Sequence, residues 1–254
     1  MSVFVEVIGN GPALTLLHGW GLNGAVWNGV RDALAEQYTL HLIDLPGHGH
    51  SHAATTASLT AVADVVAYAM PERSHLLGWS LGGLVAQDLA RRHAERVDKL
   101  VLVASTPSFL RRDDWPHAVQ PAVLADFGTR LANNHAATIK RFLARQVLNT
   151  PNIRDRVNEL QKAITSRGTT DLAALAAALE ILRTTDLRQH VATLPQPALV
   201  IQGDHDALTP EPAARWMAEH MPNARYAMIA HAAHAPFMSH RDAFLRELHA
   251  FLNA

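Results

Sequence analysis

The stretch "LLGWSLGGLVAQDLA", residues 76–90, decides the fold because two structural patterns meet in it. An apolar run typical of a buried strand precedes Ser80, and a small-residue segment with helical periodicity follows it. Gly78 stands two residues before the serine and Gly82 two residues after it. This G-x-S-x-G pattern between a strand and a helix indicates a sharp turn that exposes a nucleophilic serine.

The same letters also fit an ordinary strand–helix turn whose serine only caps the helix. A sharp turn, however, brings backbones so close that a Cβ at Gly78 or Gly82 would collide with them. The Ser80 hydroxyl then projects above the sheet at the positive end of the helix dipole. In this strand-to-helix context we predict that Ser80 is a catalytic nucleophile.

Outward from this turn, short apolar runs alternate with helix-like segments. Nearly continuous apolar runs are typical of strands buried on both faces of a parallel sheet. The alternation predicts an α/β fold with a mostly parallel, doubly wound sheet. The expected strands are residues 13–19, 40–47, 74–80, 99–105, 197–204 and 224–234. The opening residues "SVFVEVIGNG" (2–11) are expected to add an antiparallel edge hairpin.

The alternation stops between about residues 107 and 190, where every segment has a helical pattern. We predict a helical lid at 108–189, inserted into a core made of 1–107 and 190–254. Such an insertion is expected over the carboxyl ends of the strands, where α/β proteins bind their ligands.

The length, the net charge and the residue counts exclude several classes of function. A length of 254 residues suits one large domain, and the net charge of -1 gives no field that favours nucleic acid or an anionic membrane. The chain has no cysteine, which excludes disulfides, thiolate metal sites and a cysteine nucleophile. No signal peptide and no apolar run long enough to cross a bilayer is visible. We expect a cytoplasmic monomer.

A serine nucleophile needs a histidine base and an acid that orients it, in the chain order serine, acid, histidine. Asp204 and Asp206 both follow the strand at 197–204, and we favour Asp206 because it lies further into the loop. Either could instead serve only as a turn or capping residue. His231 is expected at the end of the last strand, and His234 in the loop beyond it. We choose His234, although sixteen histidines make packing roles common in this chain.

The tetrahedral intermediate needs preorganised N–H donors for its oxyanion. The backbone of Leu81, directly after the nucleophile, is expected to supply one of them. The loop "HGWGLN" (18–23) follows an earlier strand, and Trp20 in it is expected to offer the second N–H and its ring. The alternative is that Trp20 is only a packing aromatic.

Together these motifs resemble the α/β-hydrolase superfamily and, in detail, the pimeloyl-[acyl-carrier protein] methyl ester esterase family of biotin synthesis. The resemblance runs over nearly the whole chain. It is carried by "LLHGWGLNGAVW" (16–27), "IDLPGHGHS" (43–51), "LLGWSLGGLVA" (76–86), "IQGDHDALTP" (201–210) and "AHAAHAPFMSH" (230–240). More specific are Trp20, Trp79, "HAPF" (234–237), "KRFLARQ" (140–146) and "LEILRTTDLRQ" (179–189). The turn "GDHD" departs from the family's pattern.

The resemblance implies hydrolysis of a methyl ester on a carrier-bound pimeloyl chain, without metal or organic cofactor. Trp79 and Leu81 beside the serine, Trp20 opposite and Phe142 above it would form an apolar slot for the acyl chain. The substrate-binding residues implied are Trp20, Ser80, Leu81, Phe142, Leu143, Ala144, Arg145, Gln146 and His234.

The lid carries an excess of basic residues that suits an acidic partner such as acyl-carrier protein. Residues 111–168 hold ten Lys or Arg and five acids, a net +5, which leaves the rest of the chain near -6. A solvated helical face explains the same count equally well. The expected docking residues are Arg141, Arg145, Arg154 and Arg156, of which the first two lie one helical turn apart.

Two other classes compete with this interpretation. A generic short-chain carboxylesterase or a C–C hydrolase of the same fold would use the same triad. A ligand-sensing protein that keeps the fold without turnover is a third possibility, against which the complete serine, acid and histidine set counts. A nucleic-acid binder has no support, because no basic stripe with interleaved aromatics occurs outside the lid.

Overall fold

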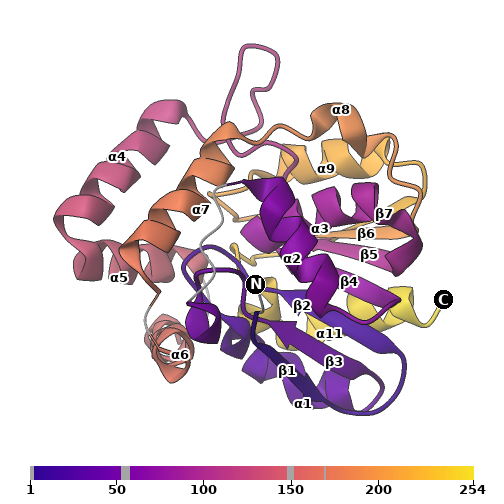
Figure 1. Cartoon of the computed structure of the whole chain (residues 1–254). Coiled ribbons are helices and arrows are strands. Elements are labelled where there is room, and N and C mark those ends of the chain that lie inside the picture. Colours follow the sequence, from indigo (N-terminus) through magenta and orange to yellow (C-terminus); the bar gives the residue numbers. More distant parts are fainter. Residues whose placement is uncertain (1–2, 53–57, 148–151, 169) are drawn as a thin grey trace.

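The computed structural model describes residues 3–52, 58–147, 152–168 and 170–254, and in them seven strands form one sheet (Figure 1). The strand order is β1-β3-β2-β4-β5-β6-β7, and every neighbouring pair except β1 and β3 is parallel. This confirms the predicted α/β fold. The strands are β1 (Val5–Ile8), β2 (Ala13–Leu17), β3 (Thr39–Ile43), β4 (Ser74–Trp79), β5 (Val97–Val103), β6 (Ala198–Gly203) and β7 (Ala224–Ile229).

The expected antiparallel edge strand is present, but it does not form a hairpin with the strand that follows it in the sequence. Strand β1 is antiparallel and lies at the sheet edge, but it pairs with β3, with Val5 opposite Ile43 and Ile8 opposite Leu40. Strand β2 cannot accept it because both of its edges are already occupied by the parallel strands β3 and β4.

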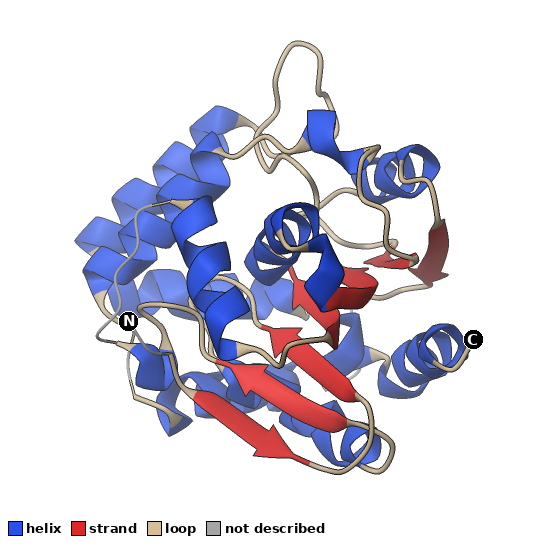
Figure 2. Cartoon of the chain, turned by 45° about the vertical axis from the view of Figure 1, so that its right-hand side comes forward, coloured by secondary structure: helices blue, strands red, loops and turns tan. Residues whose placement is uncertain are grey.

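Helices cover both faces of the sheet (Figure 2). Alternate strand residues enter two separate apolar clusters: Leu100 and Leu102 of β5 enter one, and Val101 and Val103 enter the other. The first cluster is completed by α2 (Leu59–Ala69), α3 (Leu81–Arg92) and α9 (Glu211–His220). The second is completed by α1 (Asn28–Ala35), α10 (Pro236–Ser239) and α11 (Arg241–Leu252). Burial on both faces explains the continuous apolar runs of the central strands.

Four helices occupy most of the predicted lid, in a layer beside the sheet (Figure 1). They are α4 (Pro121–Asn133), α5 (His135–Gln146), α6 (Ile153–Ser166) and α7 (Leu172–Thr184). The described residues between α4 and α7 contain no strand. A short helix that the sequence did not indicate, α8 (Arg188–Val191), spans the predicted boundary between residues 189 and 190.

No helix among the described residues has both the length and the apolar character needed to span a membrane.

The turn between β4 and α3 is as crowded as the glycine pattern predicts. A Cβ on Gly78 would lie 2.3 Å from the carbonyl oxygen of Gly82, and a Cβ on Gly82 would lie 2.5 Å from that of Leu17. Ser80 itself has φ 56° and ψ -117°, a conformation that L-residues rarely adopt. This packing holds the serine in a strained backbone at the start of α3.

Candidate active site

The three predicted catalytic side chains form one hydrogen-bonded chain. His234 Nε2 lies 2.8 Å from Ser80 Oγ, and His234 Nδ1 lies 2.7 Å from Asp206 Oδ2. The serine follows β4, the aspartate follows β6 and the histidine follows β7, so the ends of three parallel strands bring them together. All three are buried; only 7% of Ser80 and 1% of His234 is exposed. This is the arrangement that activates a serine.

Asp206 fixes the tautomer of the histidine. Burial opposes its ionisation, but attraction from His234 and hydrogen bonds from His234 and Thr209 outweigh burial, so the pKa of Asp206 lies below its ordinary value. An ionised carboxylate only accepts hydrogen bonds, which places the proton of His234 on Nδ1. Nε2 is then free to accept the Ser80 hydroxyl proton. Asp206 also accepts from Leu208 N, Thr209 N, Thr209 Oγ1 and Gln202 Nε2.

The two competing candidates, Asp204 and His231, are not part of this hydrogen-bonded triad. Asp204 directly follows β6 and has no hydrogen bond to either His234 or Ser80 among the described residues. The expectation that His231 lies at the end of the last strand is wrong, since β7 ends at Ile229 and His231 is exposed in the turn beyond it with φ 63°. Asp204, His205 and His231 gather instead into a separate cluster.

Two backbone N–H groups stand near the nucleophile without a partner. Among the described residues, neither the backbone N–H of Leu81 nor that of Trp20 donates a hydrogen bond. The loop that carries Trp20 approaches the serine closely, because a Cβ on Gly19 would lie 3.3 Å from the Cβ of Ser80. The indole N–H of Trp20 is engaged, since Nε1 donates to the carbonyl of Leu175 at 3.0 Å. Of the two N–H groups of Trp20, the backbone one is therefore the one that has no partner among the described residues and can donate to an oxyanion.

His18 shapes this loop as a neutral imidazole. Burial and repulsion from His48 lower the pKa of His18 to about 3. Its Nε2 accepts from the backbone N–H of Leu45 at 2.9 Å, so its Nδ1 carries the proton and donates to the carbonyl of Gly19 at 2.8 Å. The ring thereby links the loop after β2 to the loop after β3.

The rings of Trp20, Phe127 and Phe142 connect the core to the lid. Trp20 packs edge-on against Phe127 of α4 and Phe142 of α5, with centroid distances of 5.2 and 5.1 Å. Phe142 is half-buried in this contact.

Trp79 does not line the slot that was expected beside the serine. Its indole is 1% exposed and packs against Trp27 and Phe237 in the apolar cluster of α1 and α11. Its Nε1 donates to the backbone carbonyl of His234 at 2.7 Å. Side chains alternate between the two faces along β4, which directs Trp79 to that face of the sheet. There its hydrogen bond holds the backbone of His234 in place.

The remaining lid residues of the predicted set have different environments. Leu143 is buried, Ala144 is half-buried and Arg145 is exposed. Gln146 is 1% exposed, and its backbone carbonyl accepts from Ala235 N, next to His234, at 3.0 Å. Its side-chain Oε1 is buried without a partner among the described residues. Phe142 and Gln146 thus reach the core around the site, whereas Arg145 faces solvent.

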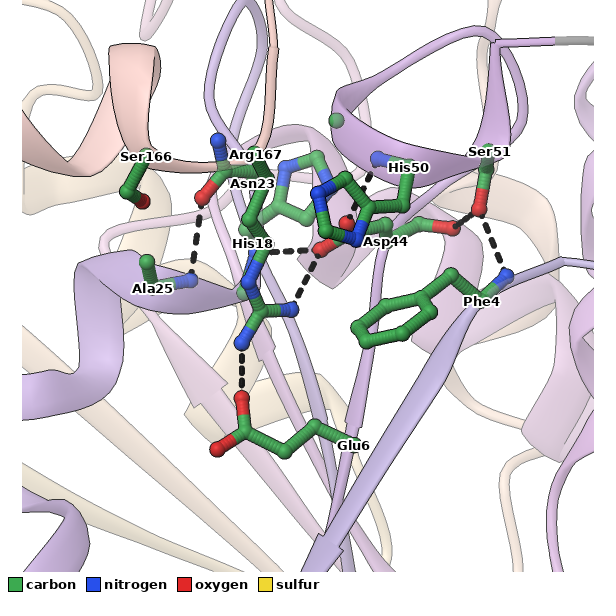
Figure 3. A network of polar contacts seen from close by, with 12 residues as sticks. Phe4, Glu6, His18, Asn23, Ala25, Asp44, His50, Ser51, Ser166 and Arg167 are labelled. Carbon is green, nitrogen blue, oxygen red and sulfur yellow. Dashed lines mark hydrogen bonds and ion pairs between the residues drawn. The ribbon is translucent and has the colours of Figure 1, made fainter.

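A buried ionic network that sequence reasoning missed joins the predicted lid to β1 and to the turn at Gly24, which follows the loop that carries Trp20 (Figure 3). Arg167, just after α6, donates to Asp44 Oδ1 at 2.9 Å and pairs with Glu6 of β1. Asp44 also accepts from the backbone N–H groups of Gly24 at 2.7 Å and His50 at 3.0 Å. Arg167 was counted in the basic surface of the lid, but it is 7% exposed and its charge is matched inside the protein. The one sequence feature that could have indicated this network is Asp44 in the motif "IDLPGHGHS".

The fold and the site define a class of protein. Residues 12–241 match the family model for the alpha/beta hydrolase fold. The solved esterase from Exiguobacterium antarcticum superposes with a TM-score of 0.90 at 23% identity, covering 99% of this chain and 96% of that one. A bromoperoxidase from Bacillus anthracis also gives 0.90, at 22% identity, covering 99% and 95%. At these identities the likeness concerns the fold, and the protein is an α/β hydrolase.

More similar relatives show which family of α/β hydrolases the chain belongs to. A pimeloyl-[acyl-carrier protein] methyl ester esterase from Aeromonas hydrophila is 45% identical over 99% of this chain and 100% of its own length. Proteins of the same name from Nitrosomonas europaea and Serratia marcescens are 43% and 41% identical, over 96% and 100% of this chain and 97% and 99% of their own lengths. The chain belongs to the pimeloyl-[acyl-carrier protein] methyl ester esterase family.

Proposed function

We propose that this protein is a cytoplasmic, monomeric serine carboxylesterase that hydrolyses the methyl ester of pimeloyl-[acyl-carrier protein] and frees the pimeloyl carboxylate for biotin biosynthesis. The hydrogen-bonded chain from Ser80 through His234 to Asp206 carries the chemistry of this proposal. The substrate rests on the names of relatives that align over nearly the full chain. The chain of hydrogen bonds also counts against a ligand sensor without turnover.

The first half of the reaction forms an acyl-enzyme. Ser80 Oγ attacks the ester carbonyl carbon while His234 Nε2 takes the hydroxyl proton. The backbone N–H groups of Leu81 and Trp20 hold the oxyanion of the tetrahedral intermediate. The C–O bond to the methoxy group then breaks, and His234 returns the proton so that methanol leaves.

The second half releases the acid. A water molecule attacks the acyl carbonyl as His234 Nε2 accepts its proton, and the same two N–H groups hold the second oxyanion. The bond to Ser80 Oγ breaks, and the serine recovers its proton from His234. These steps use only the serine, the histidine, the two N–H groups and water, and phosphopantetheine arrives as part of the substrate.

A comparison of substrates tests the proposal against a generic carboxylesterase. We expect the kcat/KM for pimeloyl methyl ester on acyl-carrier protein to exceed that for p-nitrophenyl butyrate by at least about 100-fold, equivalent to ~3 kcal/mol of additional transition-state binding. Hydrolysis is followed by methanol release for the first and by p-nitrophenol absorbance for the second. Comparable values across a series of p-nitrophenyl chain lengths would favour the generic esterase.

The lid offers exposed cations for docking the carrier protein. Arg141, Arg145 and Arg154 are exposed, and the first two lie one turn apart on α5. Arg156 is half-buried and pairs with Glu159 at 2.9 Å, which makes it a weaker attractor. We propose that the first three meet the acidic surface of acyl-carrier protein.

Reversing charge at two of these positions separates docking from chemistry. Arg141→Glu and Arg154→Glu are each expected to raise KM for the carrier-bound ester about tenfold, since opposite charges at an interface rim mainly govern encounter. KM for p-nitrophenyl butyrate should not change, because this ester has no carrier. Arg246→Glu on α11 makes the same charge change far from the lid and serves as the control (Figure 1). Equal effects of the lid variants on both substrates would contradict carrier docking here.

A further inference from the structure

The residues that the triad leaves unused at the ends of β6 and β7 form a second cluster. Asp204, His205 and His231 each offer one potential ligand atom, and these atoms lie within 4.8 Å of one another. His205 and His231 are exposed, and their rings meet edge to face with centroids 5.5 Å apart. Among the described residues this is the one group of three or more such side chains with metal-ligand spacing.

The backbone holds the two turns that carry the cluster side by side. The N–H of His205 donates to the carbonyl of Ala232 at 3.0 Å, which joins the turn after β6 to the turn after β7. Gly203 allows this approach, since a Cβ there would lie 2.3 Å from the same carbonyl oxygen. The left-handed conformation of His231 sets the direction of its side chain. The two turns that carry the ligands are thus held together before any ion arrives.

The ligand atoms of this cluster are not engaged elsewhere. Within the described parts of the chain, no hydrogen bond or ion pair uses the side chains of Asp204, His205 or His231. Among the described residues, the Oδ1 atom of Asp204 has no hydrogen-bond donor and is buried, although the residue as a whole is only half-buried. A buried carboxylate oxygen without a donor is costly unless something else satisfies it.

We propose that Asp204, His205 and His231 bind one borderline transition-metal ion of the Zn²⁺ type. Imidazole nitrogens and a carboxylate oxygen are ligands that Zn²⁺ takes in tetrahedral sites, with Zn–N distances of about 2.0–2.1 Å. Such a sphere brings ligand atoms to about 3.3 Å from one another, so binding requires the three side chains to rotate inward from their present spacing. Three protein ligands leave the fourth position to water.

The bound ion acts on the protein by cross-linking. It joins the turn that carries Asp206 to the turn that carries His234, without replacing any hydrogen bond of the triad. It therefore stabilises the folded state by RT ln(1 + [Zn²⁺]/Kd), which rises with the logarithm of the ion concentration, and takes no part in ester hydrolysis.

Calorimetric titration of the tag-free, chelator-treated full chain with ZnCl₂ tests this site. We expect one tight ion per chain and a melting temperature that rises with Zn²⁺ concentration. His205→Ala and His231→Asn, the latter chosen because asparagine tolerates the left-handed backbone, should each weaken binding at least about tenfold. His190→Ala removes an exposed histidine from α8 and should leave the tight site unchanged.

An unchanged affinity and stoichiometry in the His205→Ala/His231→Asn double variant, with native circular dichroism, would overturn the proposal. Absence of any tight ion in the wild-type chain would do the same. Turnover of p-nitrophenyl butyrate by the chelator-treated protein is measured in parallel. Its result bears on the esterase assignment alone, so failure of one proposal is distinguishable from failure of the other.

Discussion

Ser80→Ala is expected to lower kcat for ester hydrolysis by about 10⁵–10⁶-fold, because no acyl-enzyme can form without the hydroxyl. The fold should remain intact. The only hydrogen bond of Ser80 Oγ among the described residues is the one to His234 Nε2, and its removal leaves a space no larger than one hydroxyl group.

Turnover of p-nitrophenyl butyrate and the melting temperature together check this expectation. Ser239→Ala is a matched control, since it removes a hydroxyl that bonds the Ala235 carbonyl near the site without touching the triad. Full turnover by Ser80→Ala would remove the serine-hydrolase mechanism. A large loss in Ser239→Ala would show instead that hydroxyl deletions damage this region in general.

Asp206→Asn is expected to lower kcat by about 10⁴-fold. The amide group of asparagine can donate to His234 Nδ1, which moves the imidazole proton to Nε2 and prevents that atom from accepting the serine proton. The shape of the side chain changes little, so KM should stay close to the wild-type value. The melting temperature should fall modestly, because an amide NH2 in the place of Oδ2 cannot accept the hydrogen bond from Gln202 Nε2.

Asp204→Asn provides the comparison, since it makes the same substitution two residues earlier at a side chain with no hydrogen bond to His234 among the described residues. It should retain most of the activity. Kinetics of both variants, measured with the same ester in chelator-treated protein, decide between the two acids. The reverse ranking would mean that Asp204 orients the histidine.

The strands and the nucleophile turn were predictable because their signals are local. Continuous apolar runs mark buried parallel strands, and the two glycines around Ser80 record contacts between neighbouring backbones. Chain order and loop position favoured Asp206 and His234 over one alternative each, and these two side chains are the ones that the structure joins to Ser80 by hydrogen bonds. These residues follow strand ends, and parallel topology places such ends at one edge of the sheet.

Features that depend on packing between distant segments were not predictable. Trp79 was expected to line the substrate slot, but the pleat of β4 turns it toward Trp27 and Phe237. Arg167 appeared to be a surface cation of the lid, yet it pairs with Asp44, 123 residues away in the chain. The partner of β1 depended on which edges the other strands left open. None of these relations leaves a periodic trace in the sequence.

The Arg167 network limits how this scaffold can be re-engineered. Asp44 holds the loop turn at Gly24 and the guanidinium of Arg167 with the same carboxylate oxygen, so the lid supplies a countercharge that the core needs. A lid grafted from another hydrolase without this arginine would leave a fully buried carboxylate unpaired beside the loop that carries Trp20. An exchange of the lid therefore requires that Asp44, Glu6 and Arg167 be transferred or replaced together.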